Sequence, residues 1–187
     1  LKTMTQDFTP EDTAPSPQRR SAVVTAGANR AAARSYLRAA GMQDADFDKP
    51  MIAVVNTWSS VTPCNMHLDR LAKDVRAGII AAGGYPVDFN TIVVTDGLSM
   101  GTAGMQASLI SPEVVADRIE LALEGHQLAG GDCIVGCDKP SPAAAMALAR
   151  MDIPGLVYYG GTIMPGVTSS PRASSTRGTR AMRATMS

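Results

Sequence analysis

The stretch that decides the fold is Asp132-Cys133-Ile134-Val135-Gly136-Cys137-Asp138-Lys139, an apolar run that ends in a thiol, a carboxylate and an amine. A short apolar run between turn residues is typical of a buried strand in a parallel sheet. Thiolates suit soft iron and carboxylates suit hard magnesium, while a lysine beside them can change its protonation or be chemically modified. We therefore expect residues 132–136 to form a strand that carries a functional site at its end.

Strands and helices alternate on both sides of this stretch. Apolar runs at residues 51–55, 89–94 and 156–159 predict three more strands. Between the first two runs, apolar residues recur at three- and four-residue spacing from Leu68 to Ile79, which predicts an amphipathic helix. Alternating strands and helices imply right-handed βαβ units. The predicted fold is therefore α/β, with a parallel sheet of about four strands and helices on both faces in three layers.

A hydroxyl residue followed by proline marks three predicted helix starts, because the hydroxyl can cap a helix and proline is favoured at the first helical position. The pairs are Thr62-Pro63, Ser111-Pro112 and Ser141-Pro142. Residues 95–110, which precede the second pair, contain several glycines and are expected to form a long loop.

The two ends of the chain differ in composition from its middle. Residues 1–28 are polar and punctuated by proline, which predicts a flexible extension. Residues 167–187 contain arginines and no acidic residue, which predicts a disordered basic tail. The α/β domain between them is expected to cover residues 29–166. It begins with an alanine-rich helix at residues 30–40, whose arginines are expected on a solvated face.

Composition narrows the class of protein. The 187 residues include 45% hydrophobic and 18% charged residues, which is typical of one globular domain. The 17 basic and 17 acidic residues balance, so we expect neither a nucleic-acid nor a membrane partner. Three cysteines are too few for a disulfide framework and fit a reducing compartment. We therefore expect a cytoplasmic protein.

Two other polar stretches follow predicted strands and match the chemistry of the opening one. They are Thr62-Pro63-Cys64-Asn65 and Thr95-Asp96-Gly97-Leu98-Ser99-Met100-Gly101. In open parallel sheets, ligands gather outside the carboxyl ends of the strands. Cys64, Asp96 and the end of the opening stretch are thus expected to face one pocket.

Several uncommon strings occur together and in a fixed order, which makes them more specific than any one of them alone. The strings are Asn56-Thr57-Trp58, Thr62-Pro63-Cys64-Asn65-Met66-His67-Leu68, Asp96-Gly97-Leu98-Ser99-Met100-Gly101, Gly136-Cys137-Asp138-Lys139 and Gly160-Gly161-Thr162-Ile163-Met164-Pro165-Gly166. Over about residues 29–166 the chain resembles the amino-terminal part of the dihydroxy-acid dehydratases, an iron–sulfur family shared with phosphogluconate and sugar-acid dehydratases. Residues 167–187 are expected to lie outside this resemblance.

The resemblance implies a role for each candidate residue. Cys64 and Cys137 would be thiolate ligands of an iron–sulfur cluster, with 2Fe–2S favoured over 4Fe–4S, which acts as a Lewis acid on the substrate's C3 hydroxyl. Asp96, Asp138 and a carbamylated Lys139 would hold Mg²⁺. The substrate would be a small 2,3-dihydroxy-3-methyl carboxylate, dehydrated to a 2-keto acid in valine and isoleucine synthesis. The resemblance also implies a homodimer for the full-length protein.

We expect the chain to depart from the family pattern in two ways. It is expected to lack the third cluster cysteine and the carboxyl-terminal domain that would supply the catalytic base. The catalytic base is therefore unknown. The chain alone is therefore expected to be inactive. After Lys139 the family pattern is also lost, and Pro140 is expected to favour an extended conformation at that lysine.

Each candidate also has a structural interpretation when taken alone. Free cysteines are usually buried, aspartates often stabilise turns, and a lone lysine is usually solvated. Cys133 is interpreted as structural, because four residues of extended strand place it roughly 13 Å from Cys137. His67 is interpreted as a packed or hydrogen-bonded side chain. Three alternatives to a dihydroxy-acid dehydratase domain stay open: a truncated non-catalytic product, a fragment of a sugar-acid dehydratase, and a binding domain for a small phosphorylated or carboxylated metabolite.

Overall fold

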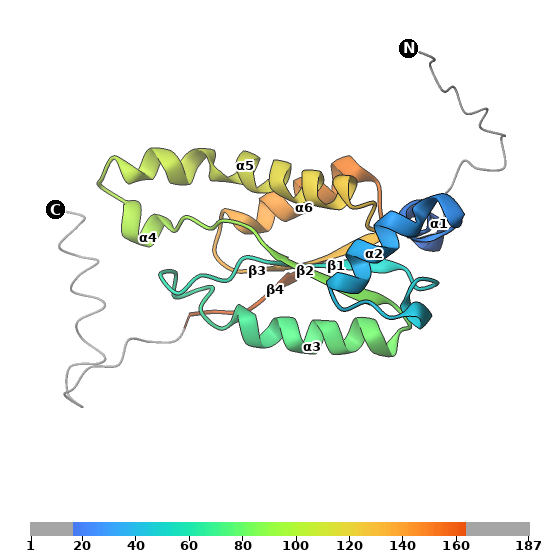
Figure 1. The fold of residues 1–187 in the computed structure, drawn as a ribbon. Helices are drawn as coiled ribbons and strands as arrows, with labels where there is room; N and C mark the ends of the chain where they lie inside the picture. Colours follow the sequence, from blue (N-terminus) through green and yellow to red (C-terminus); the bar gives the residue numbers. More distant parts are fainter. Residues whose placement is uncertain (1–16, 164–187) are drawn as a thin grey trace, which may run out of the picture.

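Four parallel strands form the central sheet of the protein, in the spatial order β2-β1-β3-β4 (Figure 1). The computed structural model describes residues 17–163. The strands are β1 (Met51–Asn56), β2 (Tyr85–Asn90), β3 (Gly130–Val135) and β4 (Gly155–Tyr159). The predicted α/β class and four-stranded parallel sheet are confirmed.

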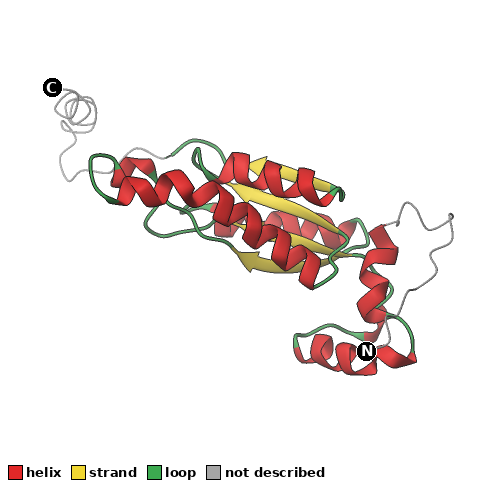
Figure 2. Cartoon of the chain, turned by 90° about the horizontal axis from the view of Figure 1, so that it is seen from above, coloured by secondary structure: helices red, strands yellow, loops and turns green. Residues whose placement is uncertain are grey.

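Helices cover both faces of the sheet. Helix α3 lies on one face, and α5 and α6 lie on the other (Figure 1). Both views place α1 and α2 at the opposite end of the molecule from the start of α5 (Figure 1, Figure 2). The helices are α1 (Pro17–Thr25), α2 (Ala31–Ala39), α3 (Leu68–Ala81), α4 (Asp96–Ser99), α5 (Gly104–Gly125) and α6 (Pro140–Met151), with 3₁₀ turns η2 (Ala28–Arg30) and η3 (Asp44–Asp46). Within residues 17–163 every helix is too short or too polar to span a bilayer.

The main core lies between the sheet and helices α5 and α6. Alternate residues of β1 and β3 point into it, and α5 contributes Val115, Ile119 and Leu123, all essentially inaccessible to solvent. A smaller apolar cluster under α3 includes Leu68 and Ile134. Burial on both faces explains why β1 and β3 are almost continuously apolar.

The strand order creates a switch point between β1 and β3. The chain leaves β1 for β2 on one side, then passes back over β1 to reach β3 on its other side. The loops that follow β1 and β3 therefore lie at the same carboxyl edge of the sheet. In folds of this kind, ligands bind outside that edge.

Strand β2 begins four residues earlier than predicted. The prediction rested on the apolar residues 89–94. In the structure, Gly83 turns the chain after α3 with a positive φ of 85°. The Tyr85 N–H then already donates to Pro50 O, next to β1. Pairing with β1 thus starts as soon as the helix ends. Pro86 is tolerated because β2 is an edge strand, where a missing N–H costs little.

Helix α5 begins at Gly104, so the predicted helix start at Ser111-Pro112 is wrong. Pro112 lies inside the helix and cannot donate to Ser108 O, the carbonyl one turn earlier. The Ser111 hydroxyl donates to Ser108 O instead, at 2.8 Å. This side-chain bond replaces the missing backbone bond, and much of the predicted loop at 95–110 is helical as α4 and α5.

The other two predicted helix starts differ in outcome. Helix α6 begins at Pro140, within two residues of the prediction. Helix α3 begins only at Leu68, because the backbone after Thr62 forms turns, with the Asn65 N–H donating to Thr62 O at 2.9 Å.

Part of the predicted amino-terminal extension is folded. Residues 1–16 lie outside the described residues, but α1 packs against the sheet, and the Met51 N–H donates to the buried Ser21 hydroxyl at 2.9 Å. Arg34 of α2 donates to the backbone oxygen of Thr25 at 2.9 Å, so this arginine is not simply solvated as predicted. Residues 17–25 of the predicted extension are therefore helical and bonded to β1 through Ser21, while the predicted flexibility stays a prediction. The predicted tail at 167–187 lies outside the described residues.

Candidate functional site

The two cysteines of the site, here called the thiol pair (Cys64 and Cys137), lie on the two loops that flank the switch point. Cys64 belongs to the loop after β1, and Cys137 follows β3 by two residues. Gly136 lets the loops meet, because a Cβ at Gly136 would lie 2.5 Å from Cys64 O and 3.2 Å from Asn65 Oδ1. Only a residue without a side chain allows this approach.

Cys137 is held in a strained conformation by its neighbours. Its φ is 66°, in the left-handed region that residues with a Cβ rarely adopt. The Ser141 hydroxyl donates to Cys137 O at 2.9 Å, and Thr95 Oγ1 lies 3.7 Å from Cys137 Sγ. Burial raises the pKa of the Cys137 thiol, against the opposing effect of the Thr95 hydroxyl. Such strain is typical of functional positions.

The carboxylate pair (Asp96 and Asp138) meets at the amine of Lys139. Lys139 Nζ lies 2.6 Å from Asp138 Oδ2 and 2.8 Å from Asp96 Oδ2. Hydrogen bonds to Asp138 and then to Asp96 hold the pKa of Lys139 above its usual range. The same bond to Lys139 lowers the pKa of the Asp138 carboxyl. Two residues far apart in sequence, at the start of α4 and at the end of β3, thus share one cation.

The thiol and carboxylate pairs touch. Cys137 Sγ lies 3.3 Å from Asp138 Oδ1, and Thr95, which contacts the same sulfur, immediately precedes Asp96. Cys137, Asp96 and Asp138 therefore lie together at the carboxyl edge of the sheet, with the Cys64 backbone beside Gly136, while the roles of all four residues as ligands stay predictions.

Buried polar contacts fix the loop that carries Cys64. Asn65 is fully buried, and its Nδ2 donates to both Thr57 O and Thr57 Oγ1 at 2.8 Å. The Thr57 hydroxyl in turn donates to Ile134 O of β3, at 3.1 Å. The loop after β1 is thereby tied to the strand that leads to Cys137.

Asp96 has a second partner that the sequence motifs did not indicate. The hydroxyl of Ser108, in the second turn of α5, donates to Asp96 Oδ1. Sequence reasoning missed Ser108 because it treated residues 95–110 as a loop. In a helix that starts at Gly104, Ser108 lies four residues after the start and on the buried face. The sequence would have indicated this position only if the predicted helix had been allowed to include Pro112.

Two residues interpreted as structural behave so. Cys133 is fully buried in β3, and burial together with Asp132 raises the pKa of its thiol to about 12. His67 Nε2 lies 2.7 Å from Gly160 O and so ties the loop after β1 to the end of β4.

The expected extended conformation of Lys139 is wrong. Its φ of −83° and ψ of −46° are helical, since Lys139 is the residue that precedes α6. The contacts with Asp96 and Asp138 outweigh the preference imposed by Pro140. This conformation directs the amine towards the two carboxylates.

The donor sets match two different metals. Asp96 and Asp138 are hard oxygen donors that already contact one cation, which fits a magnesium ion. Cys64 and Cys137 are soft donors that fit iron. Within residues 17–163 no three His, Cys, Asp or Glu side chains form a single metal-binding group, so the described residues offer donors in pairs.

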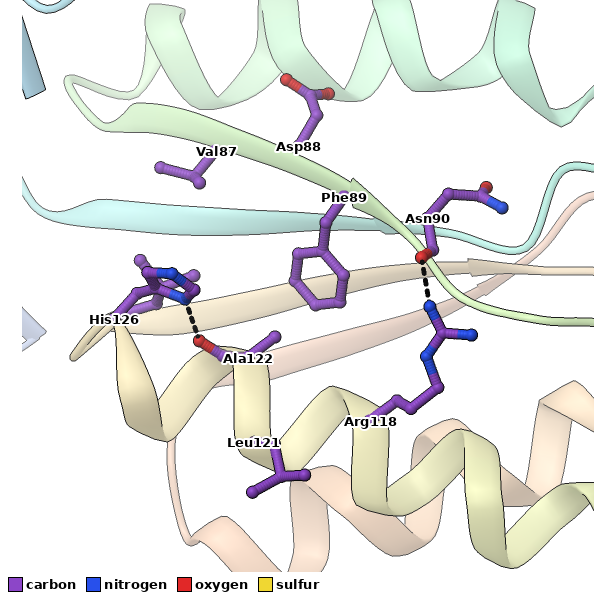
Figure 3. Close-up of a pocket in the computed structure, with 9 residues that line it drawn as sticks. Val87, Asp88, Phe89, Asn90, Arg118, Leu121, Ala122 and His126 are labelled. Carbon is purple, nitrogen blue, oxygen red and sulfur yellow. Dashed lines mark hydrogen bonds between the residues drawn. The ribbon is translucent and has the colours of Figure 1, made fainter. Parts of the chain in front are cut away.

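One cavity lies away from the predicted site residues. A cavity of about 540 Å³ lies between the edge strand β2 and α5 (Figure 3). Arg118 points to Asn90 and donates to its backbone oxygen at 3.4 Å, and His126 Nδ1 lies 2.8 Å from Ala122 O (Figure 3). Both polar side chains are bonded to backbone, and none of the predicted site residues lines this cavity.

Comparison with known proteins gives the family. The family model described as "Dihydroxy-acid/6-phosphogluconate dehydratase N-terminal" matches residues 49–186. The chain belongs to this family. The match includes residues 167–186, whereas the motifs quoted above end at Gly166.

The curated relatives are dihydroxy-acid dehydratases. The chain is 51% identical over 152 residues to the enzyme of Koribacter versatilis (strain Ellin345), which covers 81% of this chain and 26% of the relative. It is 52% identical to the enzyme of Mycobacterium avium (strain 104), with 79% and 26% covered, and 52% identical to that of Nocardioides sp. (strain ATCC BAA-499 / JS614), again with 79% and 26% covered. The chain therefore spans about a quarter of the length of the curated relatives it matches.

Proposed function

We propose that this chain is the amino-terminal part of a hydro-lyase that converts 2,3-dihydroxy-3-methyl carboxylates into 2-keto acids, in valine and isoleucine synthesis. The relatives of about 50% identity carry the name dihydroxy-acid dehydratase and cover most of this chain. Dehydratases of this family generally use an iron–sulfur cluster and Mg²⁺. The two pairs of donors at the carboxyl edge of the sheet support both cofactors.

The observation that carries the proposal is the position of the Lys139 amine between Asp96 Oδ2 and Asp138 Oδ2. Two carboxylates brought within hydrogen-bond distance of one amine repel each other unless a cation lies between them. We propose that Asp96 and Asp138 hold Mg²⁺ when Lys139 is carbamylated, because carbamylation exchanges the cationic amine for an anionic oxygen donor.

The thiol pair is proposed to hold the cluster, with 2Fe–2S favoured over 4Fe–4S. Cys64 and Cys137 lie on two loops that Gly136 allows to touch. When bound, the two cofactors would supply Lewis-acid chemistry at hydroxyl and carboxylate oxygens of the substrate. The chain's own residues would orient those oxygens, because the donors follow β1, β2 and β3 at the same edge of the sheet.

Several further features of the whole protein are part of the proposal. The partner is a small dihydroxy acid, the complete protein is a homodimer, and the compartment is the cytoplasm. A base from outside this chain removes the C2 proton, since the described site offers an amine already engaged with two carboxylates.

The test is anaerobic reconstitution with iron and sulfide, followed by metal analysis and an assay for 2-keto acid. It is run on this chain and on a full-length protein that contains it. We expect iron and sulfide to be retained by the wild type in excess of a Cys64→Ser/Cys137→Ser variant. We expect the full-length protein to dehydrate a 2,3-dihydroxy-3-methyl carboxylate. A preference for 6-phosphogluconate or a sugar acid would overturn the proposed substrate. Equal amounts of iron in the wild type and in Cys64→Ser/Cys137→Ser would overturn the proposed cluster site.

A further inference from the structure

The Asp96 carboxylate has two oxygens with two different partners. Oδ2 faces Lys139 Nζ at 2.8 Å, and Oδ1 accepts a hydrogen bond from the Ser108 hydroxyl. The Asp96 side chain retains only 21% of its solvent exposure, and Ser108 is fully buried. A carboxylate held at one oxygen by a buried donor presents the other oxygen in a fixed direction.

Ser108 is itself fixed by the fold. It lies on the face of α5 that packs into the protein, and its backbone oxygen accepts the Ser111 hydroxyl at 2.8 Å because Pro112 cannot donate there. A serine hydroxyl that is buried in a helix needs an acceptor, and the Ser108 hydroxyl bonds to the candidate metal ligand Asp96. The position of this hydroxyl therefore depends on α5 and not on α4, which begins at Asp96.

We infer that Ser108 is a positioning residue for the metal site: its hydroxyl fixes Oδ1 of Asp96 so that Oδ2 faces the cation shared with Asp138. This inference rests on the proposed magnesium site. Residues that bond to a metal ligand rather than to the metal set the ligand's orientation, and their loss lowers metal affinity by about 10- to 100-fold.

The test is Mg²⁺ titration of the chain by calorimetry, in the presence of bicarbonate so that Lys139 can be carbamylated. Ser108→Ala is compared with the wild type, with Asp96→Asn, and with Ser35→Ala as the control. Ser35 is also a helical serine, but it lies in α2 and its hydroxyl donates to the backbone oxygen of Ala31 instead of to Asp96. We expect Asp96→Asn to abolish binding, Ser108→Ala to weaken it about tenfold or more, and Ser35→Ala to leave it within about twofold.

The possible outcomes separate the two proposals. Equal affinity in the wild type and Ser108→Ala, with binding lost in Asp96→Asn, would overturn the role of Ser108 and leave the metal site standing. Equal affinity in the wild type and Asp96→Asn, or no binding to either, would overturn the proposed magnesium site of this chain.

A second measurement tests Ser108 without any metal. The coupling free energy between Asp96 and Lys139 is obtained from urea unfolding of Asp96→Asn, Lys139→Met and the double variant. The cycle is then repeated with alanine in place of Ser108. We expect the coupling to fall towards zero when Asp96 loses its fixed orientation. An unchanged coupling would show that Ser108 does not orient Asp96.

Discussion

The carboxylate pair and the thiol pair lie at the same edge of the sheet but are held in different ways. Asp96 and Asp138 are fixed by side-chain bonds to Lys139 and Ser108, so their arrangement depends on charges and hydroxyls. Cys64 and Cys137 are brought together by backbone packing at Gly136. Removal of a charged side chain should therefore disturb the carboxylate pair most. A larger side chain at Gly136 should disturb the thiol pair most.

Gly136→Ala is expected to have the largest effect. The new Cβ would overlap Cys64 O, so the loop after β1 must move, and overpacking of this kind costs about 3 kcal/mol. We expect reconstituted iron to fall to the level of the Cys64→Ser/Cys137→Ser variant, while Mg²⁺ affinity changes much less. Urea unfolding, metal analysis and calorimetry measure the three quantities. An equal loss of both metals would show that the two pairs are not held independently.

Lys139→Met should affect the carboxylate pair. Removal of the amine leaves two carboxylates without their shared partner, which we expect to lower the free energy of unfolding by about 2 kcal/mol. Millimolar Mg²⁺ should then raise the melting temperature of Lys139→Met, because a bound cation stabilises the folded state. Asp96→Asn/Lys139→Met serves as the control, and Mg²⁺ should not raise its melting temperature. If Mg²⁺ stabilises both variants equally, the ion binds elsewhere.

Asp138 should make a smaller contribution to the free energy of unfolding than Lys139, and this contribution should depend on pH. Since Lys139 lowers the pKa of this carboxyl in the folded state, its contribution is present above the unfolded pKa of about 3.9 and is lost as pH falls through the folded value. The Asp138 side chain is 56% exposed, so solvent screening limits the contribution to about 0.5 kcal/mol.

The measurement is urea unfolding of the wild type and Asp138→Asn between about pH 2 and pH 7. The wild type should be the more stable at neutral pH, and the difference should vanish in acid. A difference that is constant with pH would argue against an ion pair between Asp138 and Lys139.

The strands could be predicted where their sequence is a continuous apolar run. Strands β1, β3 and β4 were located to within two residues, because such a run has few other interpretations in an α/β protein. Strand β2 was misplaced because it mixes Pro86 and Asp88 with apolar residues. Its position is set by pairing with β1, which local sequence does not show.

The site residues with distinctive chemistry could be placed from sequence, and their supporting contacts could not. The thiol and carboxylate pairs were predicted at the carboxyl edge of the sheet because they follow strands. The bond from Ser108 to Asp96 was missed, since a lone serine has no motif and its helix was predicted to start later. The conformation of Lys139 was mispredicted because tertiary contacts overrode a local proline preference.

The central claim is that the thiol pair and the carboxylate pair form one site, and a paramagnetic measurement tests it most directly. A nitroxide is attached to Cys64 in a Cys137→Ser chain, where the buried Cys133, with a thiol pKa of about 12, stays unlabelled. Mn²⁺ is then added as a substitute for Mg²⁺. We predict strong loss of the nitroxide signal that is abolished by Asp96→Asn/Asp138→Asn. No signal loss, or a loss that is the same in that variant, would contradict a shared site.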